Sequence, residues 1–207
     1  MKREEKNLLT RQKIMEGALA EFGERNYEQA AVNNICKNNE ISKGIIYHYF
    51  RDKDELYLVC VQACFNALTS YLMKTGCEDI GEIEKVLQSY FETRFSFFDQ
   101  NPYYFNIFCD VISNPPGHLK TAITEIKKDF DELNVRMLTK LLSRTTLRNS
   151  ISTEEVVSYF CRFQNYFNLE YQKEFEECLD KKNLPKLHEE SCKRFVDILL
   201  YGIIKRE

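Results

Sequence analysis

The chain has few of the residues that interrupt helices. Only seven glycines and four prolines occur among its 207 residues, and the alternation of apolar and polar residues that indicates β-strands is scarce. Pro102, Pro115, Pro116 and Pro185 all fall where a helical pattern begins or stops. The sequence therefore predicts an all-α protein whose helices are joined by short turns.

Residues that bind metals or perform catalysis are also rare. The chain has three histidines, and its eight cysteines include no Cys-x-x-Cys pair, so we expect neither a zinc site nor another cofactor. The motifs G-x-S-x-G, H-E-x-x-H, G-x-G-x-x-G and the P-loop are missing. These absences argue against an enzyme, which stays the least favoured alternative.

Most cysteines lie within apolar helical patterns, and we expect them to be reduced residues that pack as small hydrophobes. Cys60 and Cys64 lie four residues apart on one helix face. They are the pair to examine for a redox role.

Strong net charge and long apolar runs are missing as well. The formal net charge is -3, so no overall basic field points to nucleic acid. No apolar run approaches the roughly 18 residues of a membrane helix, and the start MKREEKNLLT leads into no apolar stretch typical of a signal peptide. With 43% hydrophobic residues the chain can bury a sizeable core, and we expect a cytoplasmic protein without membrane contact.

Three short helical patterns open the chain. The first is expected to follow Thr10 as N-cap and to end at Asn26, and the second spans about 32–38. The third follows Ser42, a good N-cap, and ends near residue 50. The turn between the second and third reads Asn38, Asn39, Glu40, and we expect Asn39 to adopt the left-handed conformation there, because asparagine tolerates it.

A fourth helix is expected to begin at Asp52, with Glu55 completing a capping box, and to run to about Met73. It is too long for a small domain, which predicts that it bridges two domains. We place a smaller domain at 1–58, with the bridging helix continuing to about 73, and a larger helical domain at 74–207. Helices of the larger domain are expected at about 82–99, 102–113, 118–145, 153–180 and 186–204.

The third helix, in SKGIIYHYFRDKDEL, has two different faces. Ile46, Tyr49 and Phe50 form one apolar stripe at helical spacing, and the other residues of the helix lie off that stripe. Two short helices joined by a tight turn are typical of a helix-turn-helix, whose second helix enters the DNA major groove. Lysines and a tyrosine hydroxyl can contact phosphate, and a histidine can reach base edges. Alternatively, these are ordinary solvated helix residues.

The run RQKIMEGALAEFGERNYEQAAVNNICKNNEISKGIIYHYFRDKDELYL, residues 11–58, resembles the N-terminal domain of TetR-family transcriptional regulators. The resemblance implies a homodimer whose all-helical chains each join a three-helix DNA-binding domain to a larger domain for effector binding and dimerisation. The DNA contacts that it implies are Lys43, Gly44, Ile45, Tyr47, His48 and Lys53.

Two departures from the family pattern bear on DNA contact. Ile45 stands where the family usually has threonine, which suggests an apolar contact with a thymine methyl group. Ala31 stands where a threonine often caps the second helix, so that cap should be weaker by about 1 kcal/mol. Residues 1–58 contain ten Lys and Arg and ten Asp and Glu, which favours moderate, salt-sensitive binding over a general affinity for DNA.

The larger domain is crowded with aromatic residues. They form either a filled core with a dimer interface or the lining of a cavity between helices, the usual place for a ligand in a bundle. An arginine there could meet an anionic group. The candidate effector-binding residues are Phe91, Arg94, Phe95, Phe98, Tyr104, Phe108, Phe163 and Phe167.

The last helical pattern has more apolar surface than one partner helix needs, with Leu199 and Ile203 among its residues. It is expected to pack with 153–180 against the same helices of a second chain, or else to be buried within its own chain. The function expected is a repressor that a small hydrophobic or aromatic effector releases from a pseudo-palindromic double-stranded DNA operator. The alternative is a helix-turn-helix regulator without a small-molecule effector, gated by a protein partner.

Overall fold

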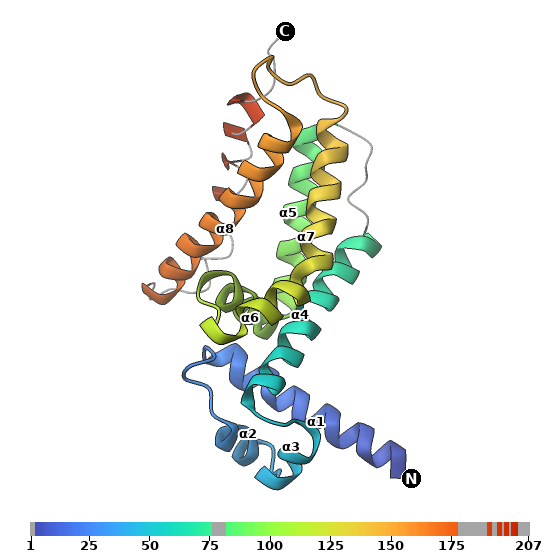
Figure 1. The fold of residues 1–207 in the computed structure, drawn as a ribbon, viewed down its shortest axis with the longest axis vertical. Coiled ribbons are helices and arrows are strands. Elements are labelled where there is room, and N and C mark those ends of the chain that lie inside the picture. Colours follow the sequence, from blue (N-terminus) through green and yellow to red (C-terminus); the bar gives the residue numbers. More distant parts are fainter. Residues whose placement is uncertain are drawn as a thin grey trace. The chain divides into compact units, whose positions relative to one another are not determined.

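A computed structural model describes residues 3–75, 82–177, 190, 191, 194, 195, 197, 198 and 200–202. The elements along the described ranges are helical, which confirms the all-α prediction (Figure 1). They are α1 (Arg3–Glu24), α2 (Val32–Asn38), α3 (Lys43–Tyr49), α4 (Lys53–Thr75), α5 (Ile83–Gln100), α6 (Pro102–Ser113), the 3-10 turn η1 (Gly117–Leu119), α7 (Lys120–Leu142) and α8 (Thr153–Glu177).

The chain divides into two compact units. The first unit contains residues 1–66 and 101–127, and the second contains 67–100 and 128–207. Helix α4 contributes its residues up to Asn66 to the first unit and the rest to the second. The N-terminal helices α1 to α3 thus share a unit with α6 and η1, which come from far along the sequence.

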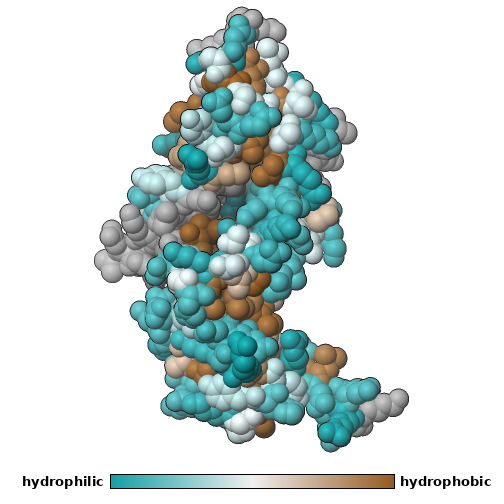
Figure 2. Space-filling model, in the orientation of Figure 1, coloured by the Kyte–Doolittle hydropathy of each residue, from teal (hydrophilic) through white to brown (hydrophobic). Residues whose placement is uncertain are grey.

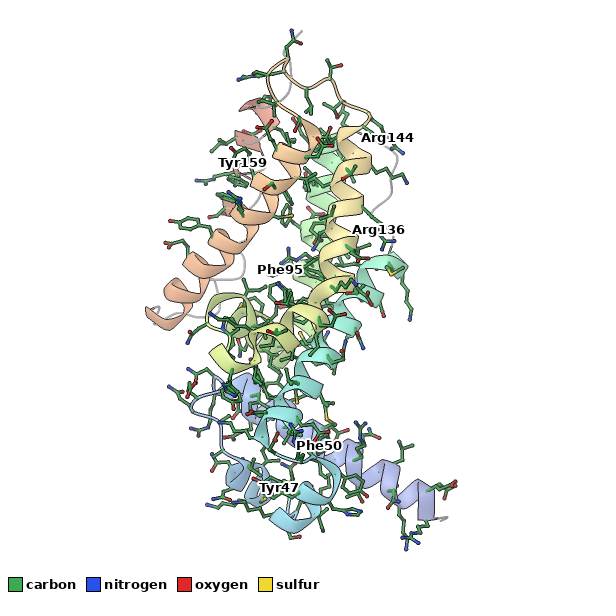
Figure 3. The ribbon with its side chains drawn as sticks, in the orientation of Figure 1. Tyr47, Phe50, Phe95, Arg136, Arg144 and Tyr159 are labelled. Carbon is green, nitrogen blue, oxygen red and sulfur yellow. The ribbon has the colours of Figure 1, made fainter. Side chains whose placement is uncertain are left out.

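The core of the first unit is built where the helical stripes meet. Ile14 and Phe22 of α1, Ile35 of α2 and Ile46 of α3 are at most 2% exposed. Phe50 follows α3 and is 2% exposed, and in Figure 3 it lies inside this group of helices. The apolar stripe expected on the third helix is therefore buried at these two positions, and that burial stabilises the domain at about 25 cal/mol per Å² of apolar surface.

Helix α6 packs closely against the end of α1. A Cβ atom at Gly23 would lie 2.7 Å from the Tyr103 Cβ, so only glycine lets the two helices approach this far. The Asn106 Nδ2 atom donates a hydrogen bond of 2.6 Å to the Gly23 carbonyl oxygen. The contact thus combines close packing with a specific polar link.

Two details of the N-terminal helices differ from the sequence prediction. Helix α1 already includes Arg3, and Thr10, expected as its N-cap, lies inside it with its hydroxyl donating to the Lys6 carbonyl oxygen (2.9 Å). A threonine can bond either way, so its presence did not locate the helix start.

The left-handed residue in the turn before α3 is Glu40 (φ 51°) rather than Asn39 (φ -112°). The Asn39 side chain instead donates from Nδ2 to the Ile35 carbonyl oxygen (2.9 Å), which caps the end of α2. This position also lets Asn39 fill the space beside Gly17, where a Cβ atom would come within 2.1 Å of that nitrogen.

The second unit has an aromatic core with polar groups inside it. Leu87 and Tyr90 of α5, Leu142 of α7 and Phe160 of α8 are at most 2% exposed. The Tyr90 hydroxyl donates to the Asn134 side-chain oxygen, and both residues are buried. Buried tyrosines need such partners, because a buried hydroxyl without one destabilises the folded protein by about 1–3 kcal/mol.

By length and apolar composition α4 could cross a membrane. Core helices of globular proteins pass the same test, and Leu56, Tyr57, Cys60 and Val61 in its first half have no exposed surface. The apolar character of this first half is therefore accounted for by packing within the first unit.

The last expected helix is described only in part. Residues 190, 191, 194, 195, 197, 198 and 200–202 are helical, with Leu200 buried and Ile198 exposed. Leu199 and Ile203, which carried the dimer prediction, lie outside the described residues.

Candidate nucleic-acid interface

Helix α3 is started by the capping residue that the sequence suggested. Ser42 has an extended backbone, and its Oγ accepts a hydrogen bond of 3.3 Å from the Ile45 N–H. An N-cap of this kind satisfies a donor that the first helical turn leaves unpaired. Together with the burial of Ile46 (1% exposed), it determines which face of α3 remains outside.

The candidate contacts of the recognition helix all lie on that outside. Lys43, Gly44 and His48 are exposed, and Ile45 and Tyr47 are 43% and 41% exposed, although large apolar side chains are usually buried. Tyr47 lies at the outer edge of the N-terminal helices (Figure 3), and the Lys43 ammonium is 5.8 Å from the centre of its ring. The surrounding surface is mainly hydrophilic in Figure 2.

No contact within the described part of the protein requires a glycine at residue 44. A Cβ atom there would meet nothing within 4 Å, and the residue lies in the first turn of α3 with no left-handed backbone. Glycine within a helix destabilises it by about 0.5–1 kcal/mol relative to alanine. A glycine at an exposed helical position suits close approach of another molecule.

The start of α4 is capped by Asp52, as expected. Its Oδ1 accepts from the Glu55 N–H (2.8 Å), while the Glu55 carboxylate accepts from the Arg51 N–H (2.6 Å), one residue earlier than in a standard capping box. The bond from the Glu55 N–H, followed by that from the Arg51 side chain, lowers the pKa of the Asp52 carboxyl. Lys53, the candidate phosphate contact, is half-buried at the first residue of this helix.

The start of α2 has no cap of its own. Ala31 makes no side-chain capping bond, in line with the weak cap expected there. Glu21 of α1 acts in its place: its Oε1 accepts from the Ala31 N–H (2.9 Å) and from the Asn34 side chain (2.8 Å). Glu21 is only 4% exposed, so α2 is attached to α1 by part-buried hydrogen bonds to a buried acceptor.

The candidate effector residues fall in both units. In the second unit, Phe91 and Phe98 are each 9% exposed, and Arg94 is 8% exposed beside the Tyr90 ring, 5.6 Å away. Phe95 lies on the same helix, α5 (Figure 3), and is half-buried. Half-buried Phe163 lies on α8, and the side chain of Phe167 is outside the described residues.

The other two candidates, Tyr104 and Phe108, belong to α6 in the first unit. Phe108 is 2% exposed, with its ring centre 5.5 Å from that of Phe65. The Tyr104 carbonyl oxygen accepts from the Cys64 Sγ at 3.3 Å. Phe108 is therefore part of the interior of the first unit, whereas Tyr104 is half-buried.

Sequence reasoning missed a polar cluster at the start of α4, made of Tyr27, Asp54, Asp110 and His118. The Tyr27 hydroxyl donates to Asp54, and His118 Nε2 lies 3.0 Å from the other Asp54 oxygen. The Asp110 carboxylate accepts from the Tyr27 N–H at 3.3 Å. These residues are up to 91 positions apart, so no local pattern could have joined them.

Within the described residues, no group of His, Cys, Asp or Glu is arranged to hold a metal ion. The arrangement is suited to binding: a capped helix presents lysine, tyrosine, histidine and an exposed glycine, and a second helix begins beside it. This is the geometry of a helix-turn-helix that reads double-stranded DNA.

Comparison with known proteins agrees with that class. Residues 14–60 match the model of "Bacterial regulatory proteins, tetR family". The negative transcriptional regulator IcaR of the biofilm operon icaADBC in Staphylococcus epidermidis is 24% identical over 174 residues, which cover 83% of this chain and 90% of that one. IcaR of Staphylococcus aureus strain Newman is 26% identical over 136 residues, 60% of this chain and 72% of its own.

Solved structures share the fold. A TetR-family regulator from Chloroflexus aurantiacus J-10-FL has a TM-score of 0.70 at 18% identity, over 95% of this chain and 94% of that one. FadR of Bacillus subtilis, in complex with stearoyl-CoA, has a TM-score of 0.71 at 16% identity, over 93% of this chain and 98% of its own.

The protein is a helix-turn-helix transcriptional regulator. Its residues 14–60 are similar to the tetR family of bacterial regulatory proteins, and the relatives and structural neighbours described above are regulators rather than enzymes.

Proposed function

We propose that the protein is a homodimeric repressor that binds a pseudo-palindromic DNA operator and leaves it when a small hydrophobic effector binds. The exposed face of α3 is the observation that carries the proposal. It presents Ile45 and Tyr47, large side chains more than 40% exposed, beside a glycine that nothing in the chain requires. Such a regulator acts where the DNA lies, in the cytoplasm.

We assign two kinds of DNA contact. Lys43, Tyr47 and Lys53 contact phosphates, whereas Ile45 and His48 face base edges, and Gly44 allows the DNA backbone to approach. Phosphate contacts set affinity and its salt dependence, while base contacts set sequence preference. The repressor assignment is supported by the similarity to IcaR, a negative regulator.

A hydrophobic effector is supported by the aromatic composition of the second unit. We propose Phe91, Arg94, Phe95, Phe98, Phe163 and Phe167 as effector-binding residues there, and Tyr104 and Phe108 of the first unit as further candidates. The B. subtilis FadR neighbour holds stearoyl-CoA, and KstR2 of Mycobacterium tuberculosis, with a TM-score of 0.63 at 19% identity over 95% of both chains, is a ketosteroid regulator. An apolar ligand class is thus compatible with the fold.

Helix α4 is the proposed route of the response, because it runs unbroken from Lys53 into the second unit. By linkage, an effector that lowers DNA affinity a hundredfold must itself bind a hundredfold more weakly to the DNA complex. That corresponds to a coupling free energy of about 2.7 kcal/mol.

The test is selection of duplexes from a random library by the purified full-length protein. We expect two related half-sites whose centres lie about one helical turn apart, or a small multiple of it. Tyr47→Ala should weaken binding to all selected sequences, whereas His48→Ala should change which base is preferred at one position. Failure to enrich any sequence would contradict the proposal.

A regulator gated by a protein partner, without a small-molecule effector, is the second candidate. It is favoured by the close packing of Phe108 against Phe65 and of Phe91 near Phe160, whose ring centres lie 6.5 Å apart. Native mass spectrometry of the purified protein distinguishes the two. A co-purifying small molecule supports the first candidate, and operator binding that no ligand library alters supports the second.

A further inference from the structure

Tyr27 joins three segments of the first unit. It lies between α1 and α2 and is 9% exposed. Its hydroxyl donates to Asp54 Oδ1 in the first turn of α4, and its backbone N–H donates to Asp110 Oδ2 of α6. Burial, together with the Asp54 carboxylate, raises the pKa of the Tyr27 hydroxyl. That hydroxyl therefore remains a donor over the ordinary pH range.

The Asp110 carboxylate is a buried anchor for this arrangement. It is 5% exposed, and the atom that accepts from Tyr27 also accepts from the Tyr57 hydroxyl, at 3.0 Å. The rings of Tyr27 and Tyr57 are packed edge to face, with their centres 5.0 Å apart. A charged acceptor of this kind makes stronger hydrogen bonds than a neutral one, so α6 holds Tyr27 in one orientation.

His118 approaches the Asp54 carboxylate from η1. Its Nε2 lies 3.0 Å from Asp54 Oδ2, and since a carboxylate can only accept, the imidazole is the donor. Its ring lies 5.8 Å from that of Tyr27. Tyr27 and His118 thus engage different oxygens of Asp54, which restricts the carboxylate from two sides.

Lys53, beside Asp54, lies against the Tyr27 ring. Its ammonium is 4.3 Å from the ring centre, within the range of a cation–π interaction. In the described part of the chain, Lys53 forms no ion pair. The ring face attracts the charge without accepting its N–H groups, which leaves them able to bind an anion.

We propose that Tyr27, Asp54 and His118 are positioning residues for DNA binding, which hold the Lys53 ammonium at the start of α4 where it contacts a DNA phosphate. This inference rests on the proposed function, which assigns Lys53 to phosphate. A lysine side chain that is already held loses less conformational freedom on binding. Donors on both Asp54 oxygens also reduce repulsion between that carboxylate and the nearby phosphates.

The test compares variants of the full-length protein on a selected operator duplex at several salt concentrations. Lys53→Met should lower the magnitude of the slope of log affinity against log salt by about 0.9, the value for one phosphate contact. His118→Ala should weaken binding by about threefold to tenfold and lower the slope in the same direction. The double variant should bind no more weakly than Lys53→Met alone, because His118 acts through Lys53.

Tyr27→Phe is the second variant, since it removes one hydroxyl and keeps the ring under Lys53. It should follow the pattern of His118→Ala, and thermal unfolding of each free protein shows that it is folded in the assay. Lys85→Gln is the control: it removes an exposed ion pair to Glu82 (3.0 Å) on another helix and should change neither affinity nor slope.

The outcomes distinguish a failure of the positioning role from a failure of the proposed function on which it rests. If Lys53→Met leaves binding unchanged while Tyr47→Ala weakens it, the phosphate role of Lys53 is wrong and the inference falls with it. If Lys53→Met weakens binding but His118→Ala and Tyr27→Phe do not, only the positioning role is overturned. It is also overturned if the losses from Lys53→Met and His118→Ala multiply.

Discussion

Gly23 and Tyr103 lie so close that a Cβ atom on the glycine would come within 2.8 Å of the tyrosine Cα atom. Because that atom is backbone, a side-chain rotation cannot relieve the clash. The fit of α1 against α6 therefore depends on the absence of a side chain at residue 23.

Gly23→Ala should destabilise the protein by about 1–3 kcal/mol, the usual cost of forcing extra atoms into a packed contact. Chemical denaturation measures the change. Gly117→Ala is the matched control, because nothing lies within 4 Å of its Cβ position, and it should have a much smaller effect. Equal stabilities of the two variants would contradict the close contact.

Gly44→Ala should separate stability from DNA binding. The free protein should become more stable, by up to about 1 kcal/mol, because alanine is the better helix former and meets no neighbour. Operator affinity should fall, because the added methyl group occupies space that we assign to the DNA backbone. Denaturation and fluorescence anisotropy measure the two effects, and a variant that gains stability with full affinity would remove Gly44 from the interface.

The Asp52 cap should make stability depend on pH. Its carboxyl has a lowered pKa in the folded protein because the charged form accepts from Glu55 N–H and the Arg51 side chain. Its contribution is therefore present above the unfolded pKa and is lost as the pH falls through the lower folded value, below about pH 4.

Asp52→Ala should accordingly lower the melting temperature at pH 7 and have less effect near pH 3. Asp129→Asn, which changes an exposed carboxylate within α7, is the control and should show little difference at either pH. If Asp52→Ala lowered the melting temperature equally at both pH values, the charge of Asp52 would not be involved.

The thiols of Cys60 and Cys64 should be unreactive in the folded protein. Both are fully buried, and burial raises the pKa of each, so that little of the nucleophilic thiolate forms. A colorimetric thiol reagent at pH 8 should react first with partly exposed residues such as Cys36. All eight cysteines should react after denaturation. Rapid modification of the native Cys60 and Cys64 pair would support the redox role considered for them.

Dimerisation should depend on the exposed apolar residues of the C-terminal helical segment. Ile198 is 69% exposed, and Ile198→Glu should shift the protein toward monomer and weaken operator binding together, since each half-site needs one chain. Leu8→Glu, at an equally exposed position (68%) on α1, should leave the oligomer unchanged. A monomeric unaltered protein in light scattering at micromolar concentration would contradict the homodimer.

Local sequence signals predicted the parts of the interface that depend on neighbouring residues. Ser42 and Asp52 start their helices as expected, because a capping side chain bonds only two or three residues along the chain. The burial of Ile46 followed from helical spacing in the same way. Thr10 misled the prediction because a hydroxyl can bond to a carbonyl one turn back as readily as to an N–H ahead.

The sequence could not reveal features that require tertiary contact. Asn39 looked suited to the left-handed turn conformation, but its amide is used to cap α2 beside Gly17, and Glu40 takes that conformation. Likewise, His118 and Asp54 meet only because η1 folds against the start of α4. Neither residue has neighbours that suggest the pairing.

The placement of the α2 cap on α1 has a consequence for engineered chimeras. Glu21 supplies hydrogen bonds to residues ten and thirteen positions downstream, so a segment cut from this protein after α1 would leave its cap behind. A graft of α2 and α3 into a relative with a threonine at the start of α2 would lose those bonds without gaining the hydroxyl. The smallest segment of this chain that carries α2 and α3 together with their cap therefore begins before Glu21, within the first helix.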